Sequence, residues 1–321
     1  MSLPRSERMS RVDHAWLRMD SDANLMMIVG VWLLEPKLSL AELTERIQTA
    51  LLAYPRFRQK VVEDDAGATW VDDEHFDLSH HVTREALRGK HGEAPREALK
   101  RRVAELATQP LDPSRPLWQF HLVEDLDGTQ SAMICRIHHC IGDGIALISV
   151  TLSIADGGTP PPQRKPQAES ERDWIGDTLI KPLIGVTAKG MDMLGSADAA
   201  RIGVQVAQDA AALALMADDS PTRLKGKATP GKRVAWGEPL PLEDVKAVSK
   251  AYGVSINDVL LAAVAGAIGS YLRSKGDDPT GQEIRAMVPV NLRPLAEAYK
   301  LGNRFGLAPL VLPIGIAHPG E

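Results

Sequence analysis

The feature that most constrains the fold is the stretch from residue 117 to residue 156, in which three apolar segments are separated by two turns. Residues 117–139 predict two β-strands joined by an Asp-Gly turn, which together form a hairpin. Residues 145–156, "IALISVTLSIAD", predict a helix. The stretch HHCIGDG, residues 138–144, connects the second strand to this helix. Strands and helices are mixed elsewhere too, so we expect a mixed α/β fold.

The two adjacent histidines of this stretch are predicted to point to opposite sides of the strand, because successive side chains alternate. One face carries Met133, Cys135, Ile137 and His139, and the other carries Ala132, Ile134, Arg136 and His138. His139 is the last residue before the chain turns. Proteins of the α/β class place reactive groups at the C-terminal ends of strands, so His139 is the candidate catalytic residue.

A neutral imidazole can take a proton from a hydroxyl, thiol or amine and return it later, which is the role of a general base. His139 needs no covalent intermediate if the substrate brings its own nucleophile, and the sequence has no G-x-S-x-G nucleophile elbow. Gly142 and Gly144 are expected to let the backbone turn sharply. Asp143 is expected to fold back or to pin the turn.

A structural role is the alternative for a pair of histidines. The pair His80-His81 has no Asp-Gly after it, and we interpret it as a surface or packing feature. Metal binding by His138 and His139 is disfavoured, because adjacent residues of a strand point apart and no third ligand is nearby. We therefore expect no metal.

Predicted strands and helices lie on both sides of a polar linker. Before the linker, residues 25–34, 57–63 and 68–73 predict strands, and residues 39–53 (with Ser39 as N-cap) and 94–109 predict helices. After the linker, residues 232–240 and 284–295 predict strands, and residues 241–253 and 255–276 predict helices. Gly253 closes the first of these helices, and Ser255 or Asn257 caps the second.

These patterns predict an N-terminal lobe at 1–156, a linker with apolar helices at 157–225, and the first part of a C-terminal lobe at 226–321. The helix expected at 199–217 is mostly apolar, so it is either buried between the domains or placed in a lipid interface. The apolar residues of 174–184 could rest on a membrane surface, and they could equally well cover the lobes. The second lobe has few strands, so we expect it to be incomplete and the chain to be a piece of a longer polypeptide.

Composition narrows the partners and the compartment. A formal net charge of −5 and an aromatic content of 4% disfavour nucleic acid as a partner. The two cysteines suggest neither a disulfide framework nor a metal site, which favours a reducing, cytoplasmic location. The N-terminus lacks the apolar core of a signal peptide, and we expect no membrane-spanning helix. Peripheral contact with the inner membrane or with lipid inclusions remains open.

Five stretches carry a resemblance to a known family. HHCIGDG matches the HHxxxDG motif of acyltransferases related to chloramphenicol acetyltransferase, including the condensation domains of nonribosomal peptide synthetases. Pro116-Leu117-Trp118 resembles a PLW motif, Asn257-Asp258 an ND motif and Asn291-Leu292-Arg293-Pro294 an NLRP-type motif, and "LGNRFG" (301–306) also resembles a family stretch. In this order and spacing, the chain resembles bacterial wax ester synthase/diacylglycerol acyltransferases from about residue 9 onward.

The resemblance implies a two-lobed coenzyme A-dependent acyltransferase fold with an active-site tunnel between the lobes. It also implies transfer of a fatty acyl group from acyl-CoA, used as a co-substrate, to a long-chain alcohol or to diacylglycerol. Members of the family are longer by a C-terminal part, which would be a further partner of this chain. The alternatives are a condensation-type enzyme with a carrier-bound acyl donor and a non-catalytic lipid-inclusion protein, although the latter would not need His139.

The resemblance also assigns roles to single residues. His139 would be the catalytic base, and Asp143 would pair with an arginine, best matched by Arg293, to hold the turn that ends at Gly144. Asn257 would orient substrate or help to stabilise the oxyanion, or it would only cap its helix. Trp118 is interpreted as packing, and His138 as a structural residue bonded to the backbone.

Overall fold

The computed structural model describes residues 6–65, 67–87, 89, 91–157, 218–292 and 301–316. They form two compact units. The first unit holds the described residues up to Gly157 together with Lys227–Gly237 and Asn291–Phe305, and the second holds residues 218–226, Glu238–Val290 and 306–316. Both apolar segments predicted at 174–184 and 199–217 lie outside the described residues.

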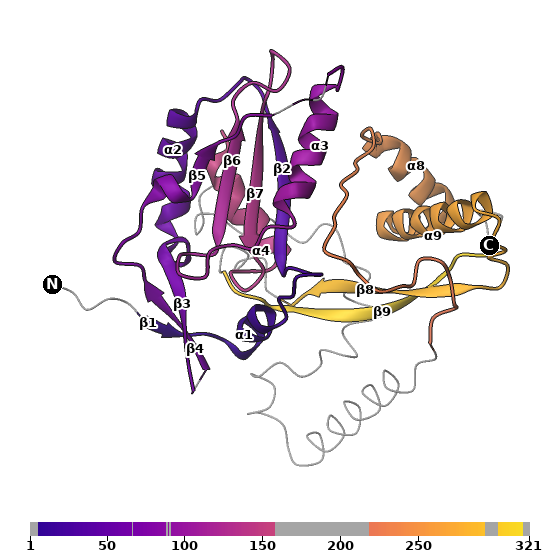
Figure 1. Cartoon of the computed structure of the whole chain (residues 1–321). Coiled ribbons are helices and arrows are strands. Elements are labelled where there is room, and N and C mark those ends of the chain that lie inside the picture. The colour runs from indigo at the N-terminus through magenta and orange to yellow at the C-terminus, as the bar shows by residue number, and fades with distance from the viewer. Residues whose placement is uncertain are drawn as a thin grey trace. The chain divides into compact units, whose positions relative to one another are not determined.

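A four-stranded sheet in the order β2-β7-β6-β5 forms the centre of the first unit (Figure 1). Its strands are β2 (Met27–Leu34), β5 (Val82–Arg84), β6 (Trp118–Val123) and β7 (Ser131–His138). All neighbours are antiparallel except β5 and β6, which run parallel. The Asp125 carboxylate accepts the N–H of Gly128 at 2.7 Å in the turn between β6 and β7. The predicted hairpin is therefore confirmed.

β7 is buried along its whole length, because a hydrophobic layer covers each of its faces. One layer combines Met133, Cys135 and Ile137 with residues of α2 (Leu40–Thr49) and α4 (Gly144–Thr151). The other layer combines Ala132 and Ile134 with residues of α3 (Pro95–Leu106). The predicted alternation of side chains along this strand is confirmed.

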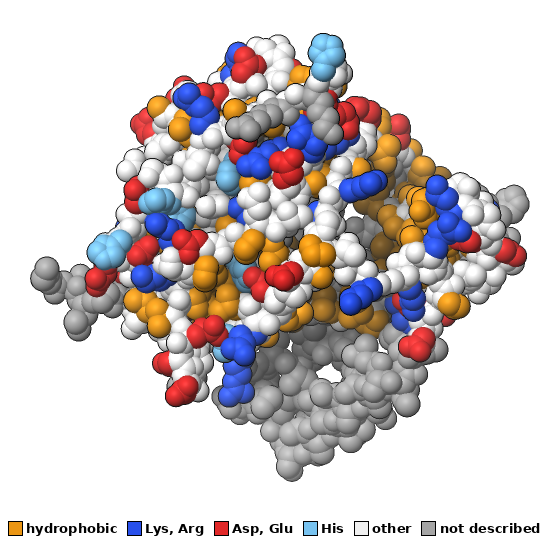
Figure 2. Space-filling view, in the orientation of Figure 1, with side chains coloured by type: hydrophobic (Ala, Val, Ile, Leu, Met, Phe, Trp, Pro, Cys, Tyr) orange, Lys and Arg blue, Asp and Glu red, His pale blue; other side chains and the backbone are white. Residues whose placement is uncertain are grey.

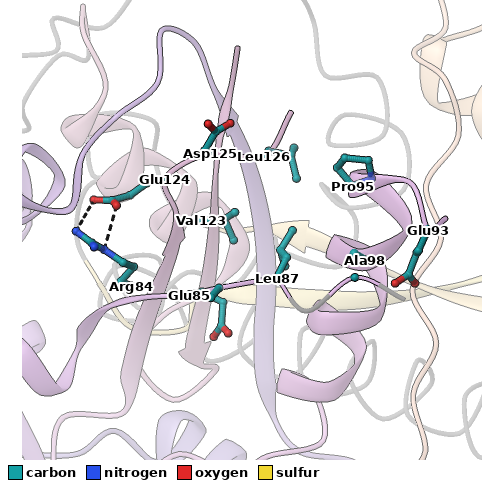
Figure 3. Close-up of a pocket in the computed structure, with 12 residues that line it drawn as sticks. Arg84, Glu85, Leu87, Glu93, Pro95, Ala98, Val123, Glu124, Asp125 and Leu126 are labelled. Atoms are coloured by element: carbon teal, nitrogen blue, oxygen red, sulfur yellow. Dashed lines mark hydrogen bonds and ion pairs between the residues drawn. The ribbon is translucent and has the colours of Figure 1, made fainter. Parts of the chain in front are cut away.

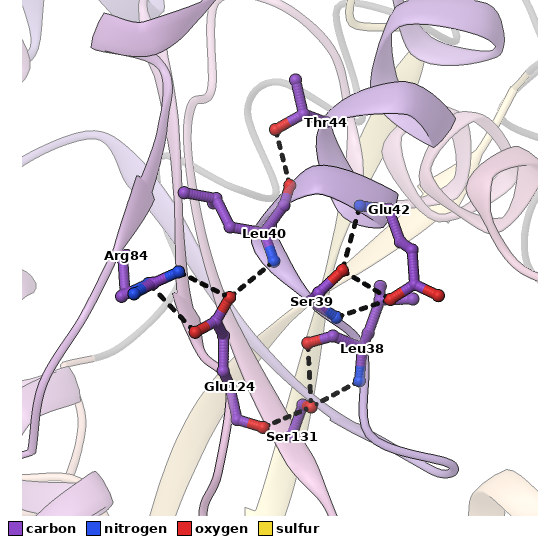
Figure 4. A network of polar contacts seen from close by, with 8 residues as sticks. All are labelled: Leu38, Ser39, Leu40, Glu42, Thr44, Arg84, Glu124 and Ser131. Carbon is purple, nitrogen blue, oxygen red and sulfur yellow. Dashed lines mark hydrogen bonds and ion pairs between the residues drawn. The ribbon is translucent and has the colours of Figure 1, made fainter.

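A polar network fixes the start of α2 beside the hairpin (Figure 4). Ser39 and Glu42 form a capping box, in which each side chain accepts the backbone N–H of the other residue. Glu124, which directly follows β6, accepts the N–H of Leu40 at 2.8 Å and pairs with Arg84 at 3.0 Å. The predicted N-cap Ser39 is confirmed, and a carboxylate from the sheet supports the same helix end.

A second sheet, in the order β1-β4-β3, completes the first unit. It consists of β1 (Ser6–Arg8), β3 (Gln59–Asp64) and β4 (Gly67–Asp72), and α1 (Arg11–Arg18) follows β1. The short 3-10 helices are η1 (Leu51–Ala53), η2 (Pro55–Arg58), η3 (Leu78–His80) and η4 (Leu152–Ile154). β3 and β4 match the predicted strands. β1, α1 and β5 have no predicted counterpart, because elements of three to eight residues give little periodic signal.

The second unit pairs β8 (Glu283–Asn291) with β9 (Phe305–Pro313) and contains α8 (Leu242–Tyr252) and α9 (Ile256–Ser274). Gly253 ends α8 in the left-handed conformation, with φ 67°, as predicted. The buried hydrophobic residues described in this unit are Ala265, Leu272, Leu312 and Ile314. Many others are exposed, including Leu242, Val248, Tyr252, Leu260, Val264, Tyr271, Met287, Leu307 and Val311. Some are visible at the surface of α8 and α9 (Figure 2).

Helix α9 departs from the expectation that no segment could span a membrane. It has 19 residues and a mean hydropathy of 1.2, and 17% of its apolar stretch is buried. By length and composition alone it is able to cross a bilayer. One such helix is weak evidence, because core helices of globular proteins pass the same test.

The predicted strand at 232–240 is wrong, since this segment joins no sheet. Val234 and Trp236 instead pack against the hydrophobic layer around α3, and Lys100 Nζ lies 5.1 Å from the centre of the Trp236 ring. This burial explains why the segment contains apolar residues.

Candidate active site

The HHCIGDG stretch forms the turn between β7, which ends at His138, and α4, which begins at Gly144. Asp143 is the N-cap of α4, and its Oδ1 accepts the N–H of Ala146 at 3.0 Å. The His139 N–H donates to the carbonyl of Met26 at 2.7 Å, just before β2 begins. The turn is therefore held by the elements on both of its sides.

Residues 301–305 contact this turn, although they are far from it in sequence. Gly142 and Gly302 form a parallel bridge, and the Gly302 N–H donates to the Ile141 carbonyl at 3.0 Å. Oδ2 of Asp143 accepts the N–H of Arg304 at 3.0 Å. Asp143 thus binds two backbone segments at once, the start of α4 and the strand that approaches it.

We expected Gly142 and Gly144 to let the backbone turn sharply. This expectation is wrong, because neither glycine has a positive φ. A Cβ on Gly142 would stand 3.5 Å from the Gly302 nitrogen and from Leu301 Cδ2, which is ordinary van der Waals contact, so the described residues give no steric reason for a glycine here. Gly144 is exposed, and a Cβ there would meet nothing described within 4 Å. The backbone conformation that favours glycine belongs to Gly302, with φ +102°.

The imidazole of His139 is joined to a buried carboxylate through one amide side chain. Nδ1 of His139 lies 3.0 Å from Oδ1 of Asn303, and Nδ2 of Asn303 donates to the His139 carbonyl at 2.7 Å. The same Nδ2 donates to Oδ1 of Asp13 at 2.7 Å. The Asn303 backbone N–H donates to the same Asp13 oxygen at 3.0 Å. Asp13 and Asn303 are buried, whereas His139 is partly exposed.

Two aromatic rings contact the same imidazole. Trp16 of α1 stacks on His139 with ring centroids 4.1 Å apart and planes 8° from parallel. The Phe305 ring lies 6.0 Å from both of them. A stacked indole limits rotation of the imidazole.

His138 has entirely different surroundings. It is 3% exposed, its Nδ1 accepts the N–H of Cys140 at 3.1 Å, and its Nε2 lies 3.3 Å from a carboxylate oxygen of Asp20. Burial lowers the pKa of His138, and the Asp20 charge opposes this shift. The two histidines therefore differ as the strand alternation predicts, with one imidazole enclosed and the other partly open.

No described contact joins the remaining predicted residues, Asn257, Arg293 and Trp118, to the side chain of His139. Asn257 is exposed in the first turn of α9, in the second unit. The N-cap there is Ser255, which forms a capping box with Asp258, so the prediction that Asn257 caps this helix is wrong. Arg293 lies outside the described residues, and its pairing with Asp143 stays a prediction. Trp118 is fully buried, and its Nε1 donates to the Phe57 carbonyl at 2.8 Å.

Sequence reasoning missed four residues of this site. Trp16, Asn303 and Phe305 contact His139, and Asp13 reaches it through Asn303. Asp13 and Trp16 stand in a short charged helix with no motif around them. Asn303 and Phe305 lie inside the stretch LGNRFG, which resembled a family stretch without suggesting a role for either residue. Only the tertiary structure brings these residues together.

A separate pocket of about 400 Å³ opens beside β5, the end of β6 and the start of α3 (Figure 3). Acidic and apolar residues line it, including Glu85, Glu93, Glu124, Leu87 and Val123. It contains neither residues of HHCIGDG nor the contacts of His139. Within the described ranges, no group of three His, Cys, Asp or Glu side chains is placed to hold a metal ion.

Solved structures share this fold. The first condensation domain of the calcium-dependent antibiotic synthetase is similar over 97% of this chain and 69% of its own, with a TM-score of 0.59 and 15% identity. A wax ester synthase/diacylglycerol acyltransferase from Marinobacter aquaeolei VT8 is similar over 88% of this chain and 64% of its own, with a TM-score of 0.57 and 23% identity. The predicted mixed α/β fold is therefore confirmed, and both of these solved structures share it.

Sequence comparison narrows this class to one family. The profile of the wax ester synthase/diacylglycerol acyltransferase catalytic domain matches residues 9–260. A putative diacylglycerol O-acyltransferase of Mycobacterium bovis is 29% identical over 87% of this chain, and the chain spans 59% of the length of that relative. The chain belongs to the wax ester synthase/diacylglycerol acyltransferase family, and the family prediction is confirmed.

Proposed function

We propose that this chain carries the catalytic lobe of an O-acyltransferase. The enzyme would transfer a long-chain fatty acyl group from acyl-CoA to a fatty alcohol, giving a wax ester, or to diacylglycerol, giving triacylglycerol. Family membership supports the reaction class. The observation that carries the proposal is His139, a partly exposed imidazole held by Asn303 at the turn of the HHxxxDG motif.

In the proposed mechanism, His139 takes the proton of the acceptor hydroxyl. The hydroxyl oxygen forms a bond to the thioester carbonyl carbon, and the carbon–sulfur bond breaks. The imidazolium then returns its proton to the leaving thiolate of coenzyme A. No acyl-enzyme is needed, because the substrate supplies the nucleophile, and acyl-CoA is a co-substrate rather than a bound cofactor.

The other predicted residues support this step. Asp143 holds the turn through its bonds to Ala146 and Arg304, and the exposed Gly144 leaves room for substrate beside the backbone. His138 keeps the end of β7 in place through Cys140. Asn257 would orient substrate or stabilise the oxyanion, which is worth about 3 kcal/mol for one donor. Arg293 would pair with Asp143.

Many large apolar side chains of the second unit are exposed, and this supports a further polypeptide partner that would cover them. We propose that this partner is the part of the acyltransferase that relatives carry outside the matched region. Peripheral contact with the inner membrane or with lipid inclusions, at the cytoplasmic side, depends on residues 174–217 and stays a prediction. Flotation of the chain with phospholipid vesicles tests it.

Thiol release from palmitoyl-CoA, with hexadecanol or dipalmitoylglycerol as acceptor, tests the proposed activity. The chain is assayed alone and after co-expression with the unmatched part of the M. bovis relative, as wild type, His139→Ala and the control His80→Ala. Acceptor-dependent release that is lost only in His139→Ala supports the proposal. Full release by His139→Ala contradicts it, as does no release in either preparation. Turnover of carrier-bound acyl donors alone would favour a condensation-type enzyme.

A further inference from the structure

The orientation of the Asn303 amide is fixed by its partners. Nδ2 lies 2.7 Å from a carboxylate oxygen of Asp13 and 2.7 Å from the carbonyl oxygen of His139, and both are acceptors. A flipped amide would place its oxygen against these two oxygens, which is repulsive. Oδ1 must therefore face Nδ1 of His139 at 3.0 Å.

An amide oxygen only accepts hydrogen bonds, so the nitrogen that faces it must carry a proton. In a neutral imidazole one nitrogen is protonated and the other is not. We propose that Asn303 and Asp13 are positioning residues that hold His139 as the Nδ1–H tautomer and leave Nε2 as the basic nitrogen. This inference rests on the proposed function, because it names the atom of His139 that would take the proton.

Asp13 anchors this arrangement from α1. Ser10 caps that helix by accepting the Asp13 N–H at 3.1 Å, which fixes the first turn where Asp13 stands. Its Oδ1 then receives both the backbone N–H and the side-chain amide of Asn303. Two bonds to one buried oxygen set both the position of the Asn303 backbone and the rotation of its amide.

Residues on both sides of Asn303 contribute to the same geometry. Gly302 adopts φ +102° and bonds to Ile141 in the turn, so Asn303 enters at a fixed distance from His139. Trp16 stacks on the imidazole and restricts rotation of the ring about its Cβ–Cγ bond. When Nε2 gains a proton, the Asn303 oxygen still accepts the Nδ1–H, so the imidazole keeps its position.

Nitrogen-15 NMR of histidine-labelled protein reads the tautomer directly, because protonated and unprotonated ring nitrogens have well separated shifts. Wild type, Asn303→Leu and Asp13→Asn are compared, with Gln48→Leu on the exposed side of α2 as control and His139→Ala for assignment. Asn303→Leu removes the acceptor and keeps the branched shape of the side chain. Asp13→Asn keeps an acceptor oxygen for Asn303 and removes only the charge. If Asn303→Leu fails to fold, the tautomer of the wild type decides the inference.

We expect His139 of the wild type to carry its proton on Nδ1, and Asn303→Leu to move it to Nε2. In the acyltransferase assay kcat falls about 100-fold in Asn303→Leu with little change in KM, and about 10-fold in Asp13→Asn with the tautomer kept. A proton on Nε2 in the wild type, or the Nδ1–H tautomer unchanged in Asn303→Leu, would overturn the inference. The NMR result needs no turnover, so an inactive protein with the expected tautomer refutes the proposed function and leaves this inference standing.

Discussion

Asp143 provides a quantitative test of how the catalytic turn is built. Asp143→Ala removes an N-cap bond to Ala146, which is worth about 1 kcal/mol. It also leaves the N–H of Arg304 without its charged acceptor, at a cost of about 1.5–3 kcal/mol. The two effects act on different segments, so we expect a loss of roughly 3 kcal/mol in the free energy of unfolding of the first unit.

The assay is urea unfolding followed by tryptophan fluorescence, because all the tryptophans described lie in the first unit. Asp143→Ser keeps the cap but is too short to reach Arg304, so it should recover about 1 kcal/mol. Asp77→Ala is the matched control, since Asp77 also caps a short helix, through Ser79, but on the surface and without a second segment. If Asp143→Ala destabilises the protein no more than Asp77→Ala, Asp143 does not clamp the turn.

Three further predictions follow from the described contacts. Trp118→Phe leaves the Phe57 carbonyl unpaired in the core, so the free energy of unfolding in urea should fall by about 2–4 kcal/mol while kcat at about 20 °C stays within a few-fold of the wild type. A large loss of kcat with full stability would instead assign Trp118 to the chemistry. Gly302→Ala forces φ +102° on a residue with a Cβ and should cost about 1–3 kcal/mol, whereas Gly144→Ala should cost under about 1 kcal/mol, and equal losses would contradict the geometry. Burial, helped by the charge of Arg136, lowers the pKa of His121 to about 4, so below pH 6.5 the folded protein binds fewer protons than the unfolded chain. The free energy of unfolding should therefore fall by about 2 kcal/mol from pH 7 to pH 5, and His121→Phe should reduce this dependence on pH.

Local patterns predicted the part of the site that local sequence builds. The apolar run at 117–139 has the period of a strand, and burial of both faces of β7 explains why its alternation translated directly into the two hydrophobic layers. The capping residues Ser39 and Ser255 were predictable for the same reason, since each interacts with a residue three positions later. His139 followed from its place at the end of that strand.

Contacts that join distant segments were not predictable in this way. Asp13, Trp16 and Asn303 meet at His139 only because α1 and residues 301–305 fold against the same turn. Their own neighbourhoods carry no periodic or motif signal that points to His139.

Burial without sheet pairing explains the clearest error in secondary structure. The segment 232–240 contains apolar residues at 234–236, and Val234 and Trp236 do become partly buried. Apolar residues indicate which side chains are covered, but they do not indicate whether the backbone pairs with another strand. In this case α3 and its hydrophobic layer cover the side chains.

The measurement that tests the central claim most directly is identification of the product by mass spectrometry. Isotope-labelled palmitoyl-CoA and hexadecanol are incubated with wild-type protein, co-expressed with the unmatched part of the relative, and with His139→Gln and His138→Gln. We predict labelled hexadecyl palmitate from the wild type, none above background from His139→Gln, and a reduced but measurable amount from His138→Gln. Labelled ester formed equally well by His139→Gln would contradict the assignment of His139 as the base.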